Sequence, residues 1–194
     1  AKEPIARGAI GMWDFPDPTI RGSRLYARGC DDVAGVAAIL AALDELARSR
    51  KAVNVLGVFT RAEEVGFAGA LAASRADRLP RGARIISIEC SSELAGGRMG
   101  EGPILRVGDL SSVFPPDLTA FCRQVATDLA GRGRRFRFQR KLMDGGTCEA
   151  SAFADHGFQA TGLCVALGNY HNVDSQRERI APEYIDLRDW DGLI

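Results

Sequence analysis

Apolar residues recur along the chain with two different periods. Residues 32–48 (DVAGVAAILAALDELAR) place Val and Leu at helical spacing, and residues 117–130 repeat this pattern. Between these two segments lie short runs rich in β-branched residues, KAVNVLGVF (51–59) and RIISIEC (84–90). Their composition is typical of strands buried on both faces, so the chain is predicted to alternate helices and strands.

The same patterns predict the remaining elements. Strands are expected at GPILRVGD (102–109), RFRFQ (135–139) and TGLCVAL (161–167), and helices from Gly66 to about Ser74, from Cys148 to Asp155 and from Pro182 onward. This order predicts an α/β fold: a three-layer α/β/α sandwich around a mixed, mostly parallel sheet, incomplete at its N-terminus.

Composition excludes several kinds of partner. The chain has 194 residues, 46% of them hydrophobic, and 25 basic residues balance 25 acidic ones. Zero net charge gives no general attraction to nucleic acid or to an anionic membrane, so neither is expected as a partner. Five cysteines without a finger-like spacing predict reduced thiols and a cytoplasmic protein. No apolar run reaches the length of a membrane-spanning helix.

Acidic residues and one histidine lie where the predicted elements meet. They are Asp31 and Asp32 before the first helix, Glu63 and Glu64 after the strand at 51–59, Glu89 near the end of the next strand, and His171 after the strand at 161–167. The carboxyl ends of parallel strands share one edge of a sheet, so these groups should converge. Carboxylates that lie so close together require cations, and one imidazole with several carboxylates suits Zn, Co or Mn.

Six fragments in order give a more specific signal. They are GCDDVAG (29–35), TRAEEVGFAGA (60–70), ISIEC (86–90), GEGP (100–103), GGT (145–147) and NYHN (169–172). Together they resemble the metal-binding core of the glutamyl and tetrahedral aminopeptidase family, within the clan of co-catalytic zinc exopeptidases. The resemblance covers about residues 22–185. It implies a homo-oligomeric metalloenzyme that removes N-terminal residues from peptides, with two divalent metal ions (Zn, or Co or Mn).

The resemblance also implies roles for single residues. Asp31 resembles the aspartate that bridges the two metals, and in the family its peptide bond to the next residue, here Asp32, is typically cis. Glu63 resembles the general base that acts on a metal-bound water. Glu64 resembles the ligand beside it, and His171 resembles the final ligand.

Two positions depart from the family pattern. Glu89 resembles a metal ligand but stands where the family usually has Asp, and Cys148 stands where Asp is common. The residues before Cys148, namely Gly145, Gly146 and Thr147, resemble a loop that lines the substrate pocket.

The larger departure concerns histidine. The family takes a second ligand histidine from a His-x-Asp motif near its N-terminus, whereas this chain has only two histidines. His156, at a helix-to-strand turn, is interpreted as an exposed residue. One metal position, formed by Asp31, Glu64 and His171, is then complete, and the other, formed by Asp31 and Glu89, lacks its histidine.

The simplest interpretation is a C-terminal portion of a longer enzyme. Residues 1–28, which contain Pro4, Pro16 and Pro18, are interpreted as the remnant of an inserted β-rich domain and its linker, and residues 29–194 as the core of the catalytic domain. Such a chain is expected to hold one metal ion or none, and to be inactive or impaired in isolation.

Other functions stay open at this level. Metallo-carboxypeptidases, dipeptidases and deacylases belong to related clans, and a non-catalytic interaction fragment is a further alternative. The stretch GRGRRFRFQRK (131–141) is typical of nucleic-acid-binding strands, but Phe136 and Phe138 facing inward, with Arg135 and Arg137 in solvent, explains it better. Cys148 as a nucleophile beside His171 has no activating neighbour in the sequence.

Overall fold

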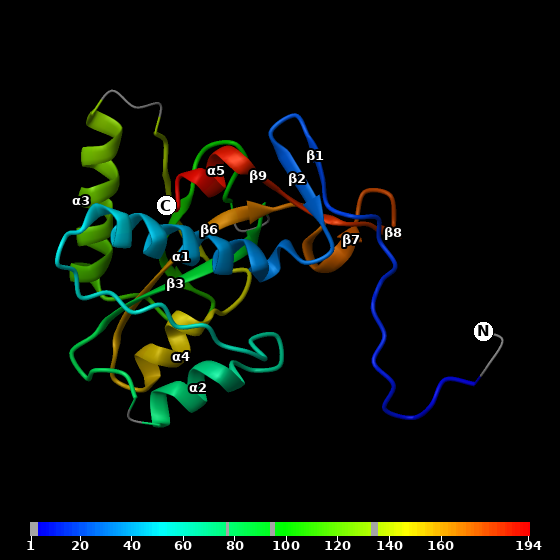
Figure 1. Cartoon of the computed structure of the whole chain (residues 1–194), viewed down its shortest axis with the longest axis horizontal. Coiled ribbons are helices and arrows are strands. Elements are labelled where there is room, and N and C mark those ends of the chain that lie inside the picture. Colours follow the sequence, from blue (N-terminus) through cyan, green and yellow to red (C-terminus); the bar gives the residue numbers. More distant parts are fainter. Residues whose placement is uncertain (1–3, 77, 94–95, 133–135) are drawn as a thin grey trace.

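A mixed four-stranded sheet in the order β3–β6–β4–β5 forms the centre of the protein (Figure 1). The computed structural model describes residues 4–76, 78–93, 96–132 and 136–194. The strands are β3 (Arg84–Ser92), β4 (Ile104–Asp109), β5 (Gln139–Met143) and β6 (Gln159–Leu167). Strand β6 runs parallel to β3 and antiparallel to β4, while β5 runs parallel to β4. The prediction of a mixed, mostly parallel sheet is confirmed.

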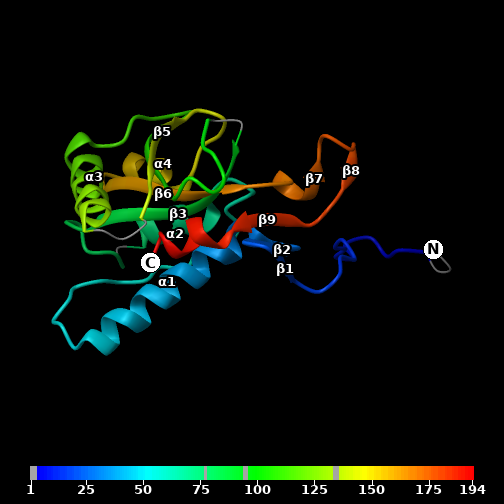
Figure 2. The same ribbon diagram turned by 90° about the horizontal axis from the view of Figure 1, so that it is seen from above.

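Helices cover both faces of this sheet. They are α1 (Cys30–Ser49), α2 (Ala68–Arg75), α3 (Pro116–Gly131), α4 (Glu149–Asp155) and α5 (Leu187–Asp191). On one face, Val165 and Leu167 of β6 pack against Ala34 of α1 and Trp190 of α5, and Figure 2 shows these two helices on the same side. On the other face, α2 and α4 pack together through a separate cluster that includes Phe153. The chain is therefore an α/β sandwich, as predicted.

A short N-terminal hairpin adds a second sheet. Strand β1 (Thr19–Arg21) pairs with β2 (Arg24–Ala27), and β2 pairs in turn with β9 (Glu183–Asp186), all antiparallel. Leu25 and Ala27 pack with Ile185 of β9 against α1, which ties the hairpin to the core. The described residues before β1 extend away from the rest of the chain (Figure 1). The origin of residues 1–28 in an inserted domain stays a prediction.

The predicted strand at 51–59 is wrong. This segment belongs to no strand of the described sheets, and its apolar side chains lie in solvent, with Val55 58% and Leu56 64% exposed. It passes α1 at Gly57, where an added Cβ would lie 2.8 Å from Cδ1 of Leu43. A segment whose residues suit burial on both faces forms a strand only when other strands lie beside it. The described residues place no strand next to residues 51–59.

Two other boundaries differ from the prediction. The terminal helix does not begin at Pro182, because residues 183–186 pair with β2 and form β9. Helix α5 begins at Leu187, where Asp186 accepts a hydrogen bond from the N–H of Arg188. The strand predicted at 135–139 is wrong for its described residues before Gln139, because residues 136–138 belong to no strand and β5 spans Gln139–Met143. The rings of Phe136 and Phe138 are nevertheless half-buried, and they stack with their centroids 6.2 Å apart. Arg137 is exposed, as expected, and Arg135 lies outside the described residues.

The last elements shape the loops after β6. A 3-10 turn, η2 (Tyr170–Asn172), follows β6, and β7 (Val173–Asp174) pairs with β8 (Arg179–Ile180). None of the described helices combines the length and the apolar character needed to cross a bilayer.

Candidate metal centre and active-site cavity

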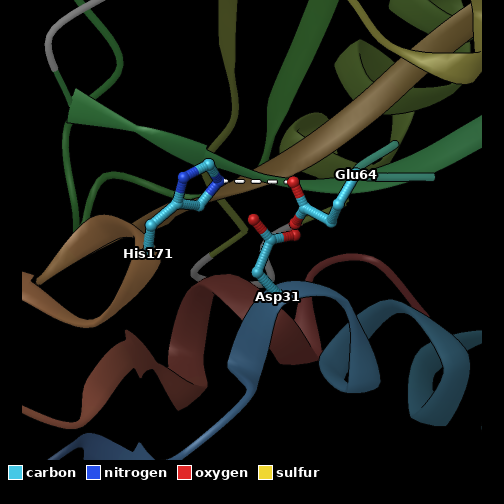
Figure 3. Close-up of side chains that lie close together, drawn as sticks. All are labelled: Asp31, Glu64 and His171. Carbon is cyan, nitrogen blue, oxygen red and sulfur yellow. Dashed lines mark ion pairs between the residues drawn. The ribbon is translucent and has the colours of Figure 1, made fainter. Parts of the chain in front are cut away.

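Three predicted metal ligands meet at one point. The carboxylates of Asp31 and Glu64 and the imidazole of His171 offer ligand atoms that all lie within 4.8 Å of one another. Figure 3 shows the three side chains turned toward a common centre, with Nε2 of His171 3.4 Å from Oε2 of Glu64. They come from the start of α1, the loop before α2 and η2, so the centre exists only in the folded chain.

The NYHN motif forms the turn that presents His171. Three of its residues, Asn169, His171 and Asn172, have positive φ, a conformation that Asn adopts more readily than most residues. The side chain of Asn169 donates to the carbonyl of Pro182 (2.8 Å), and that of Asn172 donates to the carbonyl of Arg28 (2.8 Å). The asparagines therefore hold the sharp turn in place.

The loop of Glu63 and Glu64 is fixed at both ends. At its start, the hydroxyl of Thr60 donates to the carboxylate of Glu149 in α4 (2.6 Å). At its end, the N–H of Phe67 donates to the carbonyl of Glu63 (2.9 Å), and the N–H of Gly69 donates to that of Arg61 (3.0 Å). These bonds place the two adjacent carboxyl groups beside the cavity that the structure forms there.

The GCDDVAG motif is explained by a tight approach at the start of α1. The peptide bond between Asp31 and Asp32 is cis, as the resemblance implied. The N–H of Asp31 donates to Glu183 (3.1 Å), and the N–H of Gly35 donates to Asp32 (3.1 Å). A Cβ at Gly35 would collide with the Asp32 carboxylate, so a larger residue at this position would displace that carboxylate.

The electrostatics of the centre favour a cation. Burial, together with the neighbouring carboxylates of Asp32 and Glu64, raises the pKa of Asp31 to about 9. Burial likewise raises the pKa of Glu63 to about 7, with Glu64 adding to the rise. A divalent ion removes this mutual repulsion, and Asp31, Glu64 and His171 form the mixed oxygen and nitrogen ligand set that Zn accepts. These three residues therefore fit one metal ion.

A cavity of about 410 Å³ adjoins the centre and collects most of the predicted site residues. Its lining includes Asp31, Glu63, Glu64 and Glu89, together with the loop residues Gly145, Gly146 and Thr147. The sequence fragments that lie far apart along the chain thus border one space. The roles of base, ligand and substrate contact stay predictions.

Glu89 does not join the three-residue centre. Its Oε1 accepts a hydrogen bond from Ser87 (3.1 Å), and its Oε2 lies 4.0 Å from Nη1 of Arg106. Burial raises the pKa of Glu89 to about 8, against the opposing charge of Arg106. The residues present therefore do not fit the second metal position that the resemblance implies for Asp31 and Glu89.

The structure also places residues at the site that the sequence reasoning missed. Arg106 lines the cavity, and Glu183 accepts the backbone N–H of Asp31. The available signal for Arg106 was a charged residue inside the apolar strand ILRVGD. Glu183 gave no such signal, because its neighbourhood was assigned to a helix.

A second group of candidate ligands overlaps the first. Asp31, Asp32 and Cys90 also bring ligand atoms within 4.8 Å of one another. The thiol of Cys90, however, donates to the carbonyl of Cys30 (3.4 Å), and burial raises its pKa well above the usual value. Because metal binding requires the thiolate, this group is the weaker site.

Neither His156 nor Cys148 takes part in the candidate site. His156 is half-buried, with Nδ1 2.9 Å from the carbonyl oxygen of Ala152, and it is not part of the metal-ligand groups found among the described residues. Cys148 is fully buried, and its burial raises the pKa of the thiol. A buried neutral thiol is a poor nucleophile, which removes the cysteine-based alternative.

Comparison with solved structures identifies the class of protein. The TET1 peptidase of Pyrococcus horikoshii, solved as a dodecamer, superimposes with a TM-score of 0.73 at 27% identity, covering 91% of this chain and 50% of that one. An aminopeptidase from the archaeon Desulfurococcus kamchatkensis matches with a TM-score of 0.69 at 23% identity, covering 91% and 49%. A TET aminopeptidase from a marine-sediment thaumarchaeon gives 0.74 at 20% identity, covering 90% and 49%. The fold is that of these aminopeptidases, and the chain spans about half their length.

A family model gives the particular assignment. The model of the M42 glutamyl aminopeptidases matches residues 1–183, nearly the whole chain, and the protein belongs to that family. A search of curated protein sequences found no match.

Proposed function

We propose that this chain is the part of a metal-dependent aminopeptidase that carries the catalytic base and one metal position. The observation that supports this most is the meeting of Asp31, Glu64 and His171 beside Glu63 at one cavity. The substrate would be a peptide, bound with its N-terminal residue in this cavity. Gly145, Gly146 and Thr147 would line the substrate side.

The residues at the cavity would have two roles, metal binding and proton transfer. A divalent ion, Zn or else Co or Mn, would be held by Asp31, Glu64 and His171, and when bound it would polarise the scissile carbonyl. Glu63 would take a proton from the attacking water and pass it to the leaving amine. Its raised pKa, about 7, suits this double duty, because a group that titrates near neutral pH both accepts and returns a proton.

We also propose how the protein assembles, where it is located and how active the isolated chain is. The TET1 peptidase of Pyrococcus horikoshii can assemble into a tetrahedron or a large octahedral shell, and a homo-oligomer is proposed here by similarity. Five free cysteines support a cytoplasmic location. The isolated chain is proposed to be impaired, because it offers a complete ligand set for only one of the family's two ions.

Substitution of Glu63 by Gln tests the proposed base. In the full-length protein, Glu63→Gln should lower kcat on aminoacyl anilides by at least about 100-fold, because the amide cannot accept the proton. Bound metal, measured by atomic emission, should stay unchanged.

Glu45→Gln, at an exposed position in α1, is the control and should leave both quantities unchanged. Loss of metal in proportion to activity would show that Glu63 is a ligand instead. Turnover of N-acyl or C-terminal peptide substrates in preference to aminoacyl anilides would favour a deacylase or a carboxypeptidase.

A further inference from the structure

Arg106 is a buried cation on the wall of the cavity. The residue is only 3% exposed, although it lies in β4 among apolar neighbours. Its side chain passes over β6 at Gly162, where an added Cβ would lie 2.9 Å from Cδ of Arg106. The glycine thus leaves room for the arginine to reach β3 from β4 across the intervening strand.

The guanidinium ends at the carboxylate of Glu89. Nη1 of Arg106 lies 4.0 Å from Oε2 of Glu89 and donates to the hydroxyl of Ser91 (3.4 Å). The other carboxylate oxygen, Oε1, accepts from Ser87 (3.1 Å). Both oxygens of Glu89 therefore have polar neighbours within the sheet, at the wall of the cavity that Asp31 and Glu64 also line.

The second metal position also lacks a nitrogen ligand within this chain. Of its two histidines, His171 lies beside Glu64, and Nδ1 of His156 is 2.9 Å from the carbonyl oxygen of Ala152. An ion placed beside Glu89 would lie close to the fixed positive charge of Arg106. Coulomb repulsion between Arg106 and a divalent ion opposes its binding there.

We propose that Arg106 is a built-in cation that replaces a second metal ion beside Glu89, so that the chain binds a single divalent ion at Asp31, Glu64 and His171. The inference rests on the proposed metal site. An arginine carries its charge at every physiological pH and cannot dissociate, so it opposes a divalent ion beside Glu89 at every such pH. Arg106 is in this sense a positioning residue, which holds the Glu89 carboxyl group beside its own guanidinium.

Counting the ions bound by this chain tests the inference. Equilibrium dialysis against Zn²⁺ should give one ion per chain, and Mn²⁺ should give the electron paramagnetic resonance spectrum of an isolated ion. Glu89→Gln should keep this ratio and change the Kd less than about threefold, whereas His171→Ala should weaken binding at least about tenfold.

The possible outcomes separate the two proposals. Two ions per chain, with exchange-coupled Mn²⁺, would overturn the role of Arg106 and leave the aminopeptidase intact. An affinity loss in Glu89→Gln as large as in His171→Ala would overturn it as well. Absence of any bound ion would overturn the proposed function itself.

A double-mutant cycle tests the pairing of Arg106 with Glu89 directly. Arg106→Met should lower the Tm by at least about 5 °C, because it removes the cation beside the buried carboxyl group of Glu89. Adding Glu89→Gln should restore at least half of that loss. Arg140→Met, at an exposed position in the neighbouring strand β5, is the control and should show no such rescue. Additive effects of the two substitutions would contradict the pairing.

Discussion

At the scale of single residues, the candidate metal centre brings together groups that repel one another. Asp31 lies among Asp32, Glu64, Glu89 and Glu183, and these carboxylates and its burial raise its pKa to about 9. In the folded chain without a cation, this carboxyl group therefore keeps its proton at neutral pH. The folded state then binds a proton that the unfolded chain has lost.

This difference predicts how the stability of the metal-free protein depends on pH. Because the folded pKa of Asp31 is raised above its ordinary value of about 3.9, stability should fall as pH rises from about 4 to about 9, and then level off. Saturating Zn²⁺ should oppose this fall, since the ion binds the ionised carboxylate. Thermal unfolding in EDTA and in Zn²⁺ at several pH values measures both curves.

Substitution at Asp31 provides the comparison for the pH profile. Asp31→Asn should flatten the fall of stability in EDTA, while Asp155→Asn, at an exposed position at the end of α4, should leave it as in the unsubstituted chain. A fall of equal steepness in Asp31→Asn would show that the proton belongs to another group.

The sequence predicts which residues lie at the site better than it predicts the contacts that these residues make. Asp31, Glu64 and His171 were found because each follows a recognisable motif, and the structure brings them together. The partner of Glu89 was not predictable, because Arg106 reaches it across β6 and no local spacing indicates such a path. Ligand types follow from the sequence, whereas charge balance depends on tertiary neighbours.

At the scale of elements, a helix or strand is predicted correctly when its own pattern of apolar residues is enough to determine its structure. Helix α1 and strand β6 were predicted because their patterns are long and unbroken. The segment 51–59 was not, because a strand buried on both faces needs partners that lie elsewhere in the chain. Strand β9 was missed for the opposite reason: Pro182 suggested a helix start, but pairing with β2 made the next residues extended.

The GEGP motif is explained at this scale by a contact between a loop and a helix. Asp189 of α5 is buried and accepts the N–H of Gly100 (2.6 Å) and the N–H of Gly102 (2.8 Å). Gly102 has φ of 90°, and a Cβ there would collide with the backbone of Arg137. The loop before β4 is therefore fixed to the C-terminal helix through one carboxylate.

Removing this carboxylate should destabilise the fold without affecting the metal centre. Asp189→Ala leaves two backbone donors unsatisfied, which should lower the free energy of unfolding by about 2–4 kcal/mol. Chemical denaturation measures this loss, and Zn²⁺ titration should show an unchanged Kd. Asp191→Ala, at an exposed position of the same helix, is the control and should be neutral. Equal destabilisation by both variants would contradict the importance of this contact.

At the scale of the whole molecule, the described chain spans about half the length of the aminopeptidases it superimposes on. Several large apolar residues of α1 and of the segment that follows it lie in solvent, among them Val33 and Leu56. The core, in contrast, is well closed around β6, where Val165 is fully buried. The family, the sandwich and most of the site are therefore present in this half, while one face of α1 and the segment 51–59 carry exposed apolar side chains.

X-ray absorption of the zinc-loaded chain tests whether Asp31, Glu64 and His171 hold the metal ion. The edge and fine structure should show one imidazole and carboxylate oxygens at about 2.0–2.2 Å from zinc, as expected for His171, Asp31 and Glu64. His171→Ala should remove the imidazole signal. A sulfur neighbour at about 2.3 Å would instead place the ion at Cys90 with Asp31 and Asp32, and would contradict the account.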